Sequence, residues 1–197
     1  MNKNKYIFSQ IVDYVSRYEF EKCVRRYNGD KNVYNLTCRD QFLALMFGQL
    51  TSLKSLRGIV LCLNAHPTQL YHLGFRTRKF VPSTLSRANQ SRDFRIHRDF
   101  TEYLIGITRG LYLDDNDFSI ELQNSVYALD STVIDLCLKT FQWAYFELQK
   151  SAVKIHTQLD LKGNIPSFFL ITKAKTHDAT KQLDLTISIH INTTRKN

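Results

Sequence analysis

Two kinds of hydrophobic spacing divide this chain of 197 residues. Up to about residue 110, apolar side chains recur every three or four positions, a spacing that predicts amphipathic helices. From about residue 125, apolar and polar side chains alternate instead, and this pattern predicts half-buried strands. The acidic stretch at residues 114–117 lies between the two regions. We therefore expect a first domain at residues 1–113 and a second at residues 120–197.

The first region should hold several short helices. Apolar residues at helical spacing begin at residues 5–27, and turn signals separate the helices that follow. These are expected at residues 37–50, 52–64, 69–72, 83–90 and 93–110. Thr37 or Cys38 should begin the first of these, because a hydroxyl caps exposed amides and Asp40 in the first turn suits the helix dipole. Gly74 should end the shortest of them.

Apolar stripes indicate which face the early helices bury. On the first pattern, the stripe is formed by Ile7, Ile11, Tyr14, Val15 and Tyr18. On the helix expected at residues 37–50, it is formed by Phe42, Leu45, Met46 and Gln49. Stripes of this kind predict helices with one face on a core and the other in solvent.

Three strands are expected in the second region, at residues 125–136, 153–160 and 165–172. The middle one shows the alternation most clearly, through Val153, Ile155, Thr157 and Leu159. Gly163 lies between the last two strands and supplies the positive φ that a tight hairpin needs. The fold class predicted from the whole pattern is α+β, with an all-α first domain followed by a β-meander.

Composition narrows the class of protein. Apolar residues make up 43% of the chain, which allows a packed core, and no apolar run approaches the length of a membrane span. The N-terminus lacks the features of a signal peptide. The four cysteines, which lie too far apart for a zinc knuckle, favour buried thiols in a reducing compartment. They are Cys23, Cys38, Cys62 and Cys137. We expect an intracellular, cytoplasmic protein.

Charge is unevenly distributed between the two regions. Residues 1–111 carry 18 Lys and Arg against 8 Asp and Glu, whereas residues 112–197 carry 9 against 10. A basic first half beside a nearly neutral second half indicates that the first half meets a polyanion. Nucleic acid is favoured over an anionic membrane surface, because the basic residues do not form one strongly amphipathic helix.

The most basic segment, residues 76–109, offers a plausible DNA-reading helix. It holds 8 Lys and Arg against 3 acids. On the helix expected at residues 83–90, Ser83, Arg87 and Gln90 are three or four positions apart and would share one face. Asn89 and Arg92 would lie to the side of that face. Arg, Asn and Gln read base edges, whereas Ser, Lys and Arg hold phosphates. The candidate DNA-binding residues are Ser83, Arg87, Asn89, Gln90, Arg92 and Arg95. The alternative is an ordinary solvated basic face.

Asp130 is the leading candidate for catalytic chemistry. It interrupts the apolar run SVYALDSTVIDL, where burying a carboxylate is costly unless something binds it. A strand-borne aspartate can hold Mg²⁺ or Mn²⁺ and help to activate a nucleophile. The alternative is a carboxylate at a strand end that bonds local backbone, helped by Ser131 and Thr132.

Other polar residues of the second region are weaker candidates. Asp135 lies five residues after Asp130, so strand alternation places it on the opposite face. His156 and His177 are more simply explained as structural histidines. No P-loop, GxGxxG, GxSxG or HExxH pattern occurs, so nucleotide hydrolysis, dinucleotide redox chemistry and zincin-type proteolysis lack their signatures.

Several segments together carry a resemblance to a known family. ALDSTVIDL, FQWAYF and AVKIHTQLDLKGNIPSFFLITKAKTHD resemble the start of the catalytic domain of bacterial insertion-sequence transposases of the DDE type. TCRDQFLALMFGQLTSLKSLRGIV and PSTLSRANQSRDFRIHRDF resemble the N-terminal DNA-binding domain of the same family. The resemblance extends to about Leu183.

This resemblance implies an RNase-H-like second domain, here an incomplete one. Two Asp and one Glu of the family hold two divalent metals, Mg²⁺ or Mn²⁺, which drive strand cleavage and strand transfer. Asp130 matches the first of these carboxylates. Lys154, His156, His177 and Asp178 match recurrent positions to which we assign no chemistry. The implied partner is double-stranded DNA at the element's terminal repeats, bound by a homo-oligomer associated with the nucleoid.

The chain departs from the family in its last residues. Neither the second Asp nor the Glu has a counterpart, and the tail LTISIHINTTRKN differs from the family's continuation. A frameshift or early stop is our hypothesis for this difference. We therefore expect a truncated transposase that is inactive alone and does not hold the metals tightly. The alternative is a non-enzymatic DNA-binding regulator or a remnant.

Overall fold

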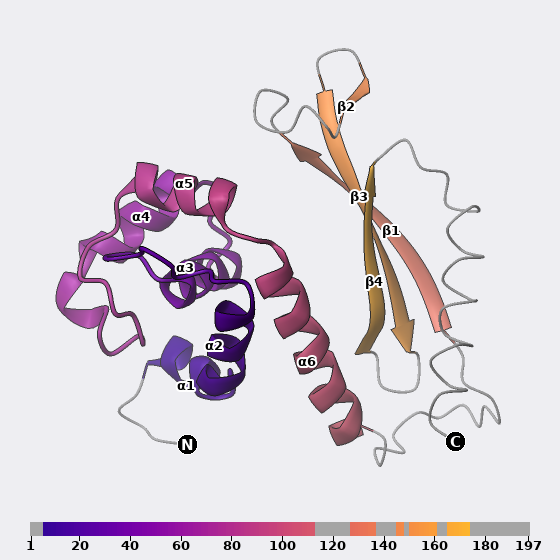
Figure 1. Cartoon of the computed structure of the whole chain (residues 1–197), viewed down its shortest axis with the longest axis horizontal. Helices are drawn as coiled ribbons and strands as arrows, with labels where there is room; N and C mark the ends of the chain where they lie inside the picture. The colour runs from indigo at the N-terminus through magenta and orange to yellow at the C-terminus, as the bar shows by residue number, and fades with distance from the viewer. Residues whose placement is uncertain (1–5, 113–126, 137–144, 148–149, 161–164, 174–197) are drawn as a thin grey trace. The chain divides into compact units, whose positions relative to one another are not determined.

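The computed structural model describes residues 6–112, 127–136, 145–147, 150–160 and 165–173 (Figure 1). The chain forms two compact units, Met1–Thr101 and Glu102–Asn197. The described part of the first is helical, and the second contains the end of the last helix and a sheet, so the fold class is α+β, as the hydrophobic spacing predicts. The domain boundary expected at residues 114–117 lies outside the described residues and stays a prediction.

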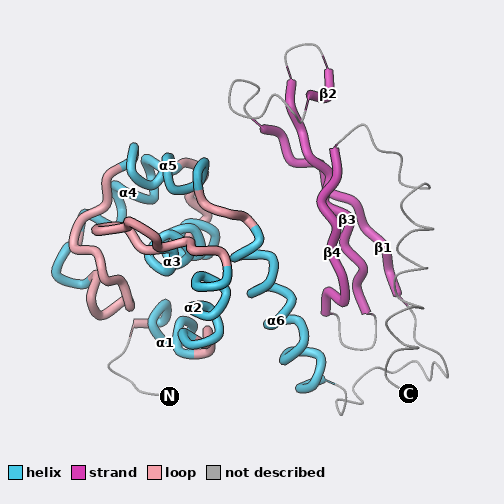
Figure 2. The backbone as a smooth tube through the Cα atoms, viewed as in Figure 1, coloured by secondary structure: helices cyan, strands magenta, loops and turns pink. Residues whose placement is uncertain are grey.

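Six α-helices and one short 3-10 helix are described, and Figure 2 distinguishes them from the loops. They are α1 (Ile7–Asp13), α2 (Arg17–Arg26), α3 (Cys38–Leu50), α4 (Leu56–Ala65), η1 (Pro67–Gln69), α5 (Pro82–Ser91) and α6 (Arg95–Tyr112). The helices expected from residues 37, 83 and 93 are confirmed to within two residues at each end. The one expected at residues 69–72 is instead the short η1 followed by a turn.

A capping box fixes the start of α3, the central helix of the first unit. The Thr37 hydroxyl accepts a hydrogen bond from the Asp40 amide at 3.1 Å, and the Asp40 carboxylate accepts one from the Thr37 amide at 3.2 Å. Two amides that the first turn leaves unpaired are satisfied in this way. The sequence-based start of this helix is therefore confirmed, and Thr37 is its N-cap.

The buried face expected for residues 5–27 is wrong. Ile7 is 78% exposed and Tyr14 is 88% exposed, whereas Phe8 and Val12 are buried. The cause is a break in the helix at residues 14–16, where Ser16 caps α2 by accepting a bond from the Glu19 amide. Because the helical phase restarts at the break, a stripe drawn continuously across it selects the wrong side chains.

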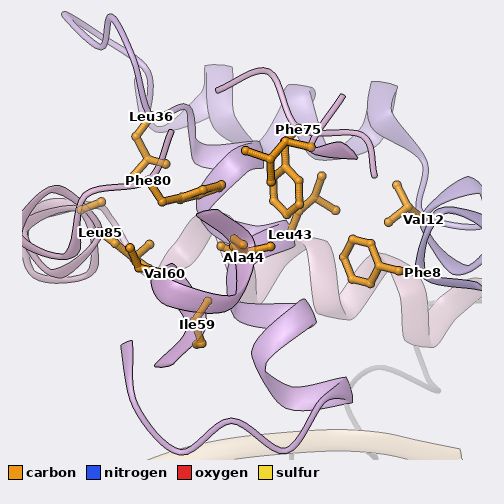
Figure 3. Packing of buried hydrophobic residues seen from close by; sticks show 13 residues of the cluster. Phe8, Val12, Leu36, Leu43, Ala44, Ile59, Val60, Phe75, Phe80 and Leu85 are labelled. Atoms are coloured by element: carbon orange, nitrogen blue, oxygen red, sulfur yellow. The ribbon is translucent and has the colours of Figure 1, made fainter. Parts of the chain in front are cut away.

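The face expected for α3 is confirmed only in part: Phe42 and Met46 pack against the core, but α3 is covered on more than one side. Leu43 and Ala44 are fully buried, whereas Gln49 of the expected stripe is exposed. Figure 3 shows side chains from other helices and loops gathered around these two residues. Helices α2, α4 and α5 all contact α3. A helix surrounded in this way needs no single apolar stripe.

Gly48 lets α3 and α4 approach closely. A Cβ atom at this position would clash with the Ile59 side chain, lying 2.8 Å from Cγ1 and closer still to Cδ1. Past Gly48 the chain turns sharply, with Ser52 at φ 56° and the Leu53 amide bonded to the Gly48 carbonyl at 2.9 Å. This turn occupies the residues where α4 was expected to begin, so α4 starts at Leu56 instead.

A second cluster of rings joins α2, α3 and α6. The Phe20 ring lies 5.0 Å from Phe42 and 5.1 Å from Phe100, measured between centroids. His97 stacks against Phe42 at 6.1 Å. Burial among these rings lowers the pKa of His97, and the charge of Arg92 lowers it further.

The second unit contains an antiparallel sheet. Its described strands are β1 (Tyr127–Leu136), β2 (Tyr145–Glu147), β3 (Lys150–Asp160) and β4 (Ile165–Lys173). Strand β3 is central: it pairs with β1 along its length, with β4 from Val153 onward and with β2 at its first residues. The three expected strands and their antiparallel order are confirmed. The short β2 was not expected.

None of the described helices combines the length and the apolar character needed to cross a bilayer.

Candidate nucleic-acid interface

Helix α5 presents a polar face to solvent while its other face is fixed in the core. Pro82 stands at the first helical position, where its ring sets φ and its missing N–H costs nothing. Leu85 and Ala88 are buried in the hydrophobic cluster. Ser83, Arg87 and Gln90 are all exposed, and their spacing of four and three residues places them on one side of the helix.

Arg92, a predicted DNA-binding residue, is instead enclosed within the first unit. Its side chain is only 8% exposed. The guanidinium donates hydrogen bonds to the Thr37 carbonyl at 3.0 Å, to the Gln41 amide oxygen at 2.8 Å and to the Leu36 carbonyl. It therefore ties the end of α5 to the start of α3 and is not presented to DNA.

Asn89 is linked to the same network although it is exposed. Its side-chain oxygen accepts a hydrogen bond of 2.6 Å from the Gln41 amide nitrogen. Gln41 is 3% exposed and thus bridges Asn89 and Arg92. Gln41 could not be recognised from the sequence, because polar residues of α3 give no signal that distinguishes a buried bridge from a solvated side chain.

Arg95 lies at the surface, held by two neighbours. Its guanidinium pairs with the Asp93 carboxylate at 2.6 Å and stands 4.6 Å above the centre of the Tyr27 ring. The hydrogen bonds from Arg95 lower the pKa of Asp93. About half of the Arg95 side chain remains exposed. It can add positive charge beside α5, with less freedom to adapt than Arg87.

Asp99 is a structural acid that the sequence analysis did not single out. Its carboxylate accepts hydrogen bonds from Arg26 at 2.6 Å, Tyr27 at 2.7 Å and Arg98 at 2.8 Å. Burial disfavours its ionisation, but these three donors outweigh burial and lower the pKa of Asp99. Asp99 thereby engages two arginines, Arg26 and Arg98, and this reduces the positive charge available to DNA.

Asp130, expected to be buried, is exposed on β1. Among the described strands β1 pairs only with β3, so it lies at the edge of the sheet, where a carboxylate keeps its hydration. The Thr132 hydroxyl donates a hydrogen bond to Asp130 at 3.2 Å. The alternative expectation was a bond to local backbone at a strand end, but the partner is the Thr132 side chain within β1, and the catalytic role of Asp130 stays a prediction.

A metal site also needs further donors near Asp130. Within the described parts of the chain, no three His, Cys, Asp or Glu side chains gather in a group that could hold a metal ion. A single exposed carboxylate does not match the ligand set that Mg²⁺ or Mn²⁺ takes in proteins. The described residues therefore do not fit the metal that the family resemblance implies, and we derive no reaction step through one.

His156 has the structural surroundings expected of it. It is 6% exposed, and its Nε2 atom lies 3.0 Å from the Thr172 hydroxyl on the neighbouring strand. Its cross-strand partner is Ser131, so alternation places His156 and Asp130 on opposite faces of the sheet. His177 and Asp178 lie outside the described residues.

Comparison with known proteins gives one match. No curated protein and no solved structure is similar to this chain. The match covers α1 to α4 and the turn that follows η1, and it stops before α5. Residues 3–76 match the family described as a domain of unknown function, DUF4372.

Proposed function

We propose that this chain is a DNA-binding protein of the insertion-sequence transposase type, whose helical unit holds double-stranded DNA at the ends of the element. The observation that carries the proposal is the exposed face of α5, formed by Ser83, Arg87 and Gln90. Its side chains combine a phosphate ligand with two groups that can reach base edges. The opposite face is anchored by Leu85 and Ala88, so the helix is held rigidly.

The transposase assignment has separate support. The matched domain occurs in transposase-like proteins. The segment that resembles the family's catalytic start forms antiparallel strands β1, β3 and β4, which is compatible with the opening of an RNase-H-like sheet. We propose that fold for the second unit, together with the homo-oligomeric state and nucleoid association of the family.

A binding assay with the full chain tests the DNA-binding proposal. Bound duplexes selected from a random pool would define the preferred sequence, and fluorescence anisotropy would then measure affinity for it. Arg87→Ala combined with Gln90→Ala should weaken binding by about ten- to hundredfold, since a bidentate base contact is worth about 1–3 kcal/mol. Arg57→Ala, which removes an exposed arginine from α4, is the matched control. Equal affinity of the double variant and the control would contradict the proposal.

A second candidate is a non-enzymatic DNA-binding regulator that occupies the element's ends. It is favoured by the exposure of Asp130 and by the lack of a metal-ligand group among the described residues. Strand cleavage of the selected duplex with Mg²⁺ separates the two candidates, and we expect none from this chain alone. Cleavage abolished by Asp130→Ala would establish a catalytic role, whereas cleavage unchanged by it would exclude Asp130 from the reaction.

A further inference from the structure

A groove lined by arginines lies in the first unit, formed by residues of α2, the start of α3 and the segment 67–78. Its volume is about 1070 Å³. Five arginines line it, compared with three acids, and we call it the arginine groove. These arginines are Arg17, Arg25, Arg39, Arg76 and Arg78. None of them belongs to the α5 face proposed above to contact duplex DNA.

Asp40 fixes the part of the arginine groove formed by residues 76–77. This carboxylate is 1% exposed, and it accepts hydrogen bonds from the backbone amides of Arg76 at 2.7 Å and Thr77 at 3.4 Å. The same side chain caps α3. A buried acid therefore holds the backbone of residues 76–77 in place and leaves the side chains of Arg76 and Arg78 exposed. Such preorganisation lowers the entropy lost when a ligand binds.

The acids of the groove are largely engaged by the protein itself. Asp30 accepts a hydrogen bond of 2.7 Å from the Cys38 amide, and Glu21 pairs with Arg17 at 2.7 Å. The Arg39 Nη1 atom is buried and has no hydrogen-bond partner within the described part of the chain. Burial lowers the pKa of Arg39, and the positive charge of Arg17 lowers it further. An anion between these guanidinium groups would offset their mutual repulsion and supply an acceptor for the Arg39 Nη1 atom.

The groove also contains an aromatic side chain, that of Tyr71, which is exposed to solvent. Tyr71, one of its lining residues, is 82% exposed. The turn that carries it is closed by bonds from the Gly74 amide to the Tyr71 carbonyl at 3.0 Å and from the Phe75 amide to the Leu70 carbonyl at 3.1 Å. Gly74 adopts φ 90°, which favours glycine, so this turn has a defined geometry.

We infer that the arginine groove binds the backbone of an unpaired DNA strand, with the Tyr71 ring stacked on one of its bases. Positively charged grooves with exposed aromatic rings are the usual means of holding single strands. The groove's volume lies just above the range of about 300–1,000 Å³ for ligand pockets, which suits a short stretch of single strand better than a duplex. The inference deepens the proposed DNA-binding function by adding a second nucleic-acid contact.

The test compares the affinity of the full chain for a fluorescein-labelled oligodeoxythymidine and for a duplex of equal length, by fluorescence anisotropy. Arg76→Ala with Arg78→Ala should weaken single-strand binding by at least about tenfold, and it should reduce the slope of log K against log salt by about 1.4, the value for two lost phosphate contacts. Tyr71→Ala should also weaken it by about tenfold, since one stacked base contributes about 1–3 kcal/mol. Binding to the duplex should change by less than about twofold, because the α5 face is intact.

Two control variants keep this inference separate from the proposed function. Arg57→Ala lies outside the groove and should leave single-strand affinity unchanged, and Arg87→Ala should weaken duplex binding alone. The inference is overturned if the chain has no single-strand affinity at low salt, or if groove variants with unchanged melting temperatures bind the single strand as tightly as Arg57→Ala does. Equal losses for duplex and single strand would likewise overturn it, because the groove would then be part of one duplex site.

Discussion

Replacement of Arg92 by methionine separates a structural arginine from a DNA-binding one. Methionine keeps much of the side chain's length and apolar stem but removes the guanidinium. The change removes a donor from the carbonyls of Leu36 and Thr37 and from the side-chain oxygen of Gln41, although the Thr37 carbonyl keeps its bond of 3.0 Å from the Gln41 amide. These acceptors lie at or just before the start of α3, the helix at the centre of the hydrophobic cluster.

The expected magnitude follows from these contacts. Each hydrogen bond to a charged group contributes about 1.5–3 kcal/mol, but the values are not additive, and the cost of burying the guanidinium offsets part of their sum. Removing one member of a buried charged network typically costs about 3–5 kcal/mol. For a folded unit of this size, a loss of 3 kcal/mol lowers the melting temperature by more than about 10 °C.

Thermal unfolding followed by circular dichroism measures this effect, with Arg87→Met on the same helix as the matched control. Arg87 is exposed, so its replacement should shift the melting temperature by no more than about 4 °C, corresponding to a surface change within about 0.5 kcal/mol. Arg92→Lys should recover little stability, because an ammonium group cannot reproduce the fork of a guanidinium. An Arg92→Met variant that melts like the native protein but loses DNA affinity would refute the structural role.

Three further predictions concern the first unit. Gly48→Ala should lower the melting temperature, since the added methyl overpacks the contact between α3 and α4 at a cost of about 1–3 kcal/mol, and a higher melting temperature would contradict this. Because the pKa of His97 is lowered in the folded state, the unfolded state takes up the proton first, so stability should fall as pH drops below about 6.5 towards that lowered pKa. Urea unfolding at several pH values should show this loss, and His97→Phe should reduce it. Burial raises the pKa of Cys23, and that of Cys38 to about 12, so iodoacetamide should label the exposed Cys62 well before either, as peptide mass spectrometry can measure.

The helix and strand pattern could largely be predicted from the sequence, because its signals are local. The reciprocal bonds of Thr37 and Asp40 join residues three positions apart, and the alternation of β3 is visible within one strand. Errors arose where a local pattern was continued across a break. The stripe drawn through Tyr14 crosses the break before α2. Residue 52, where a helix was expected to begin, lies in a turn, and the helix begins at Leu56.

The roles of individual polar residues could be predicted only in part. The shared exposed face of Ser83, Arg87 and Gln90 follows from helical spacing once α5 exists. The enclosure of Arg92 does not, because its partners lie 51 to 56 residues earlier in the chain. Asp130 lies on the predicted strand, but its exposure depends on the position of β1 in the sheet.

The order of the helices and main strands, the cap of α3 and the concentration of positive charge in the first half follow from the sequence alone, because they depend on neighbouring residues and on composition. Which charges face solvent was set by the tertiary fold. It enclosed the guanidinium of Arg92, engaged the carboxylate of Asp40 with a distant backbone segment and left Arg76 and Arg78 exposed along a groove. The physical reason is that the free energy of a charged side chain depends on its solvation and on partners that only folding brings together.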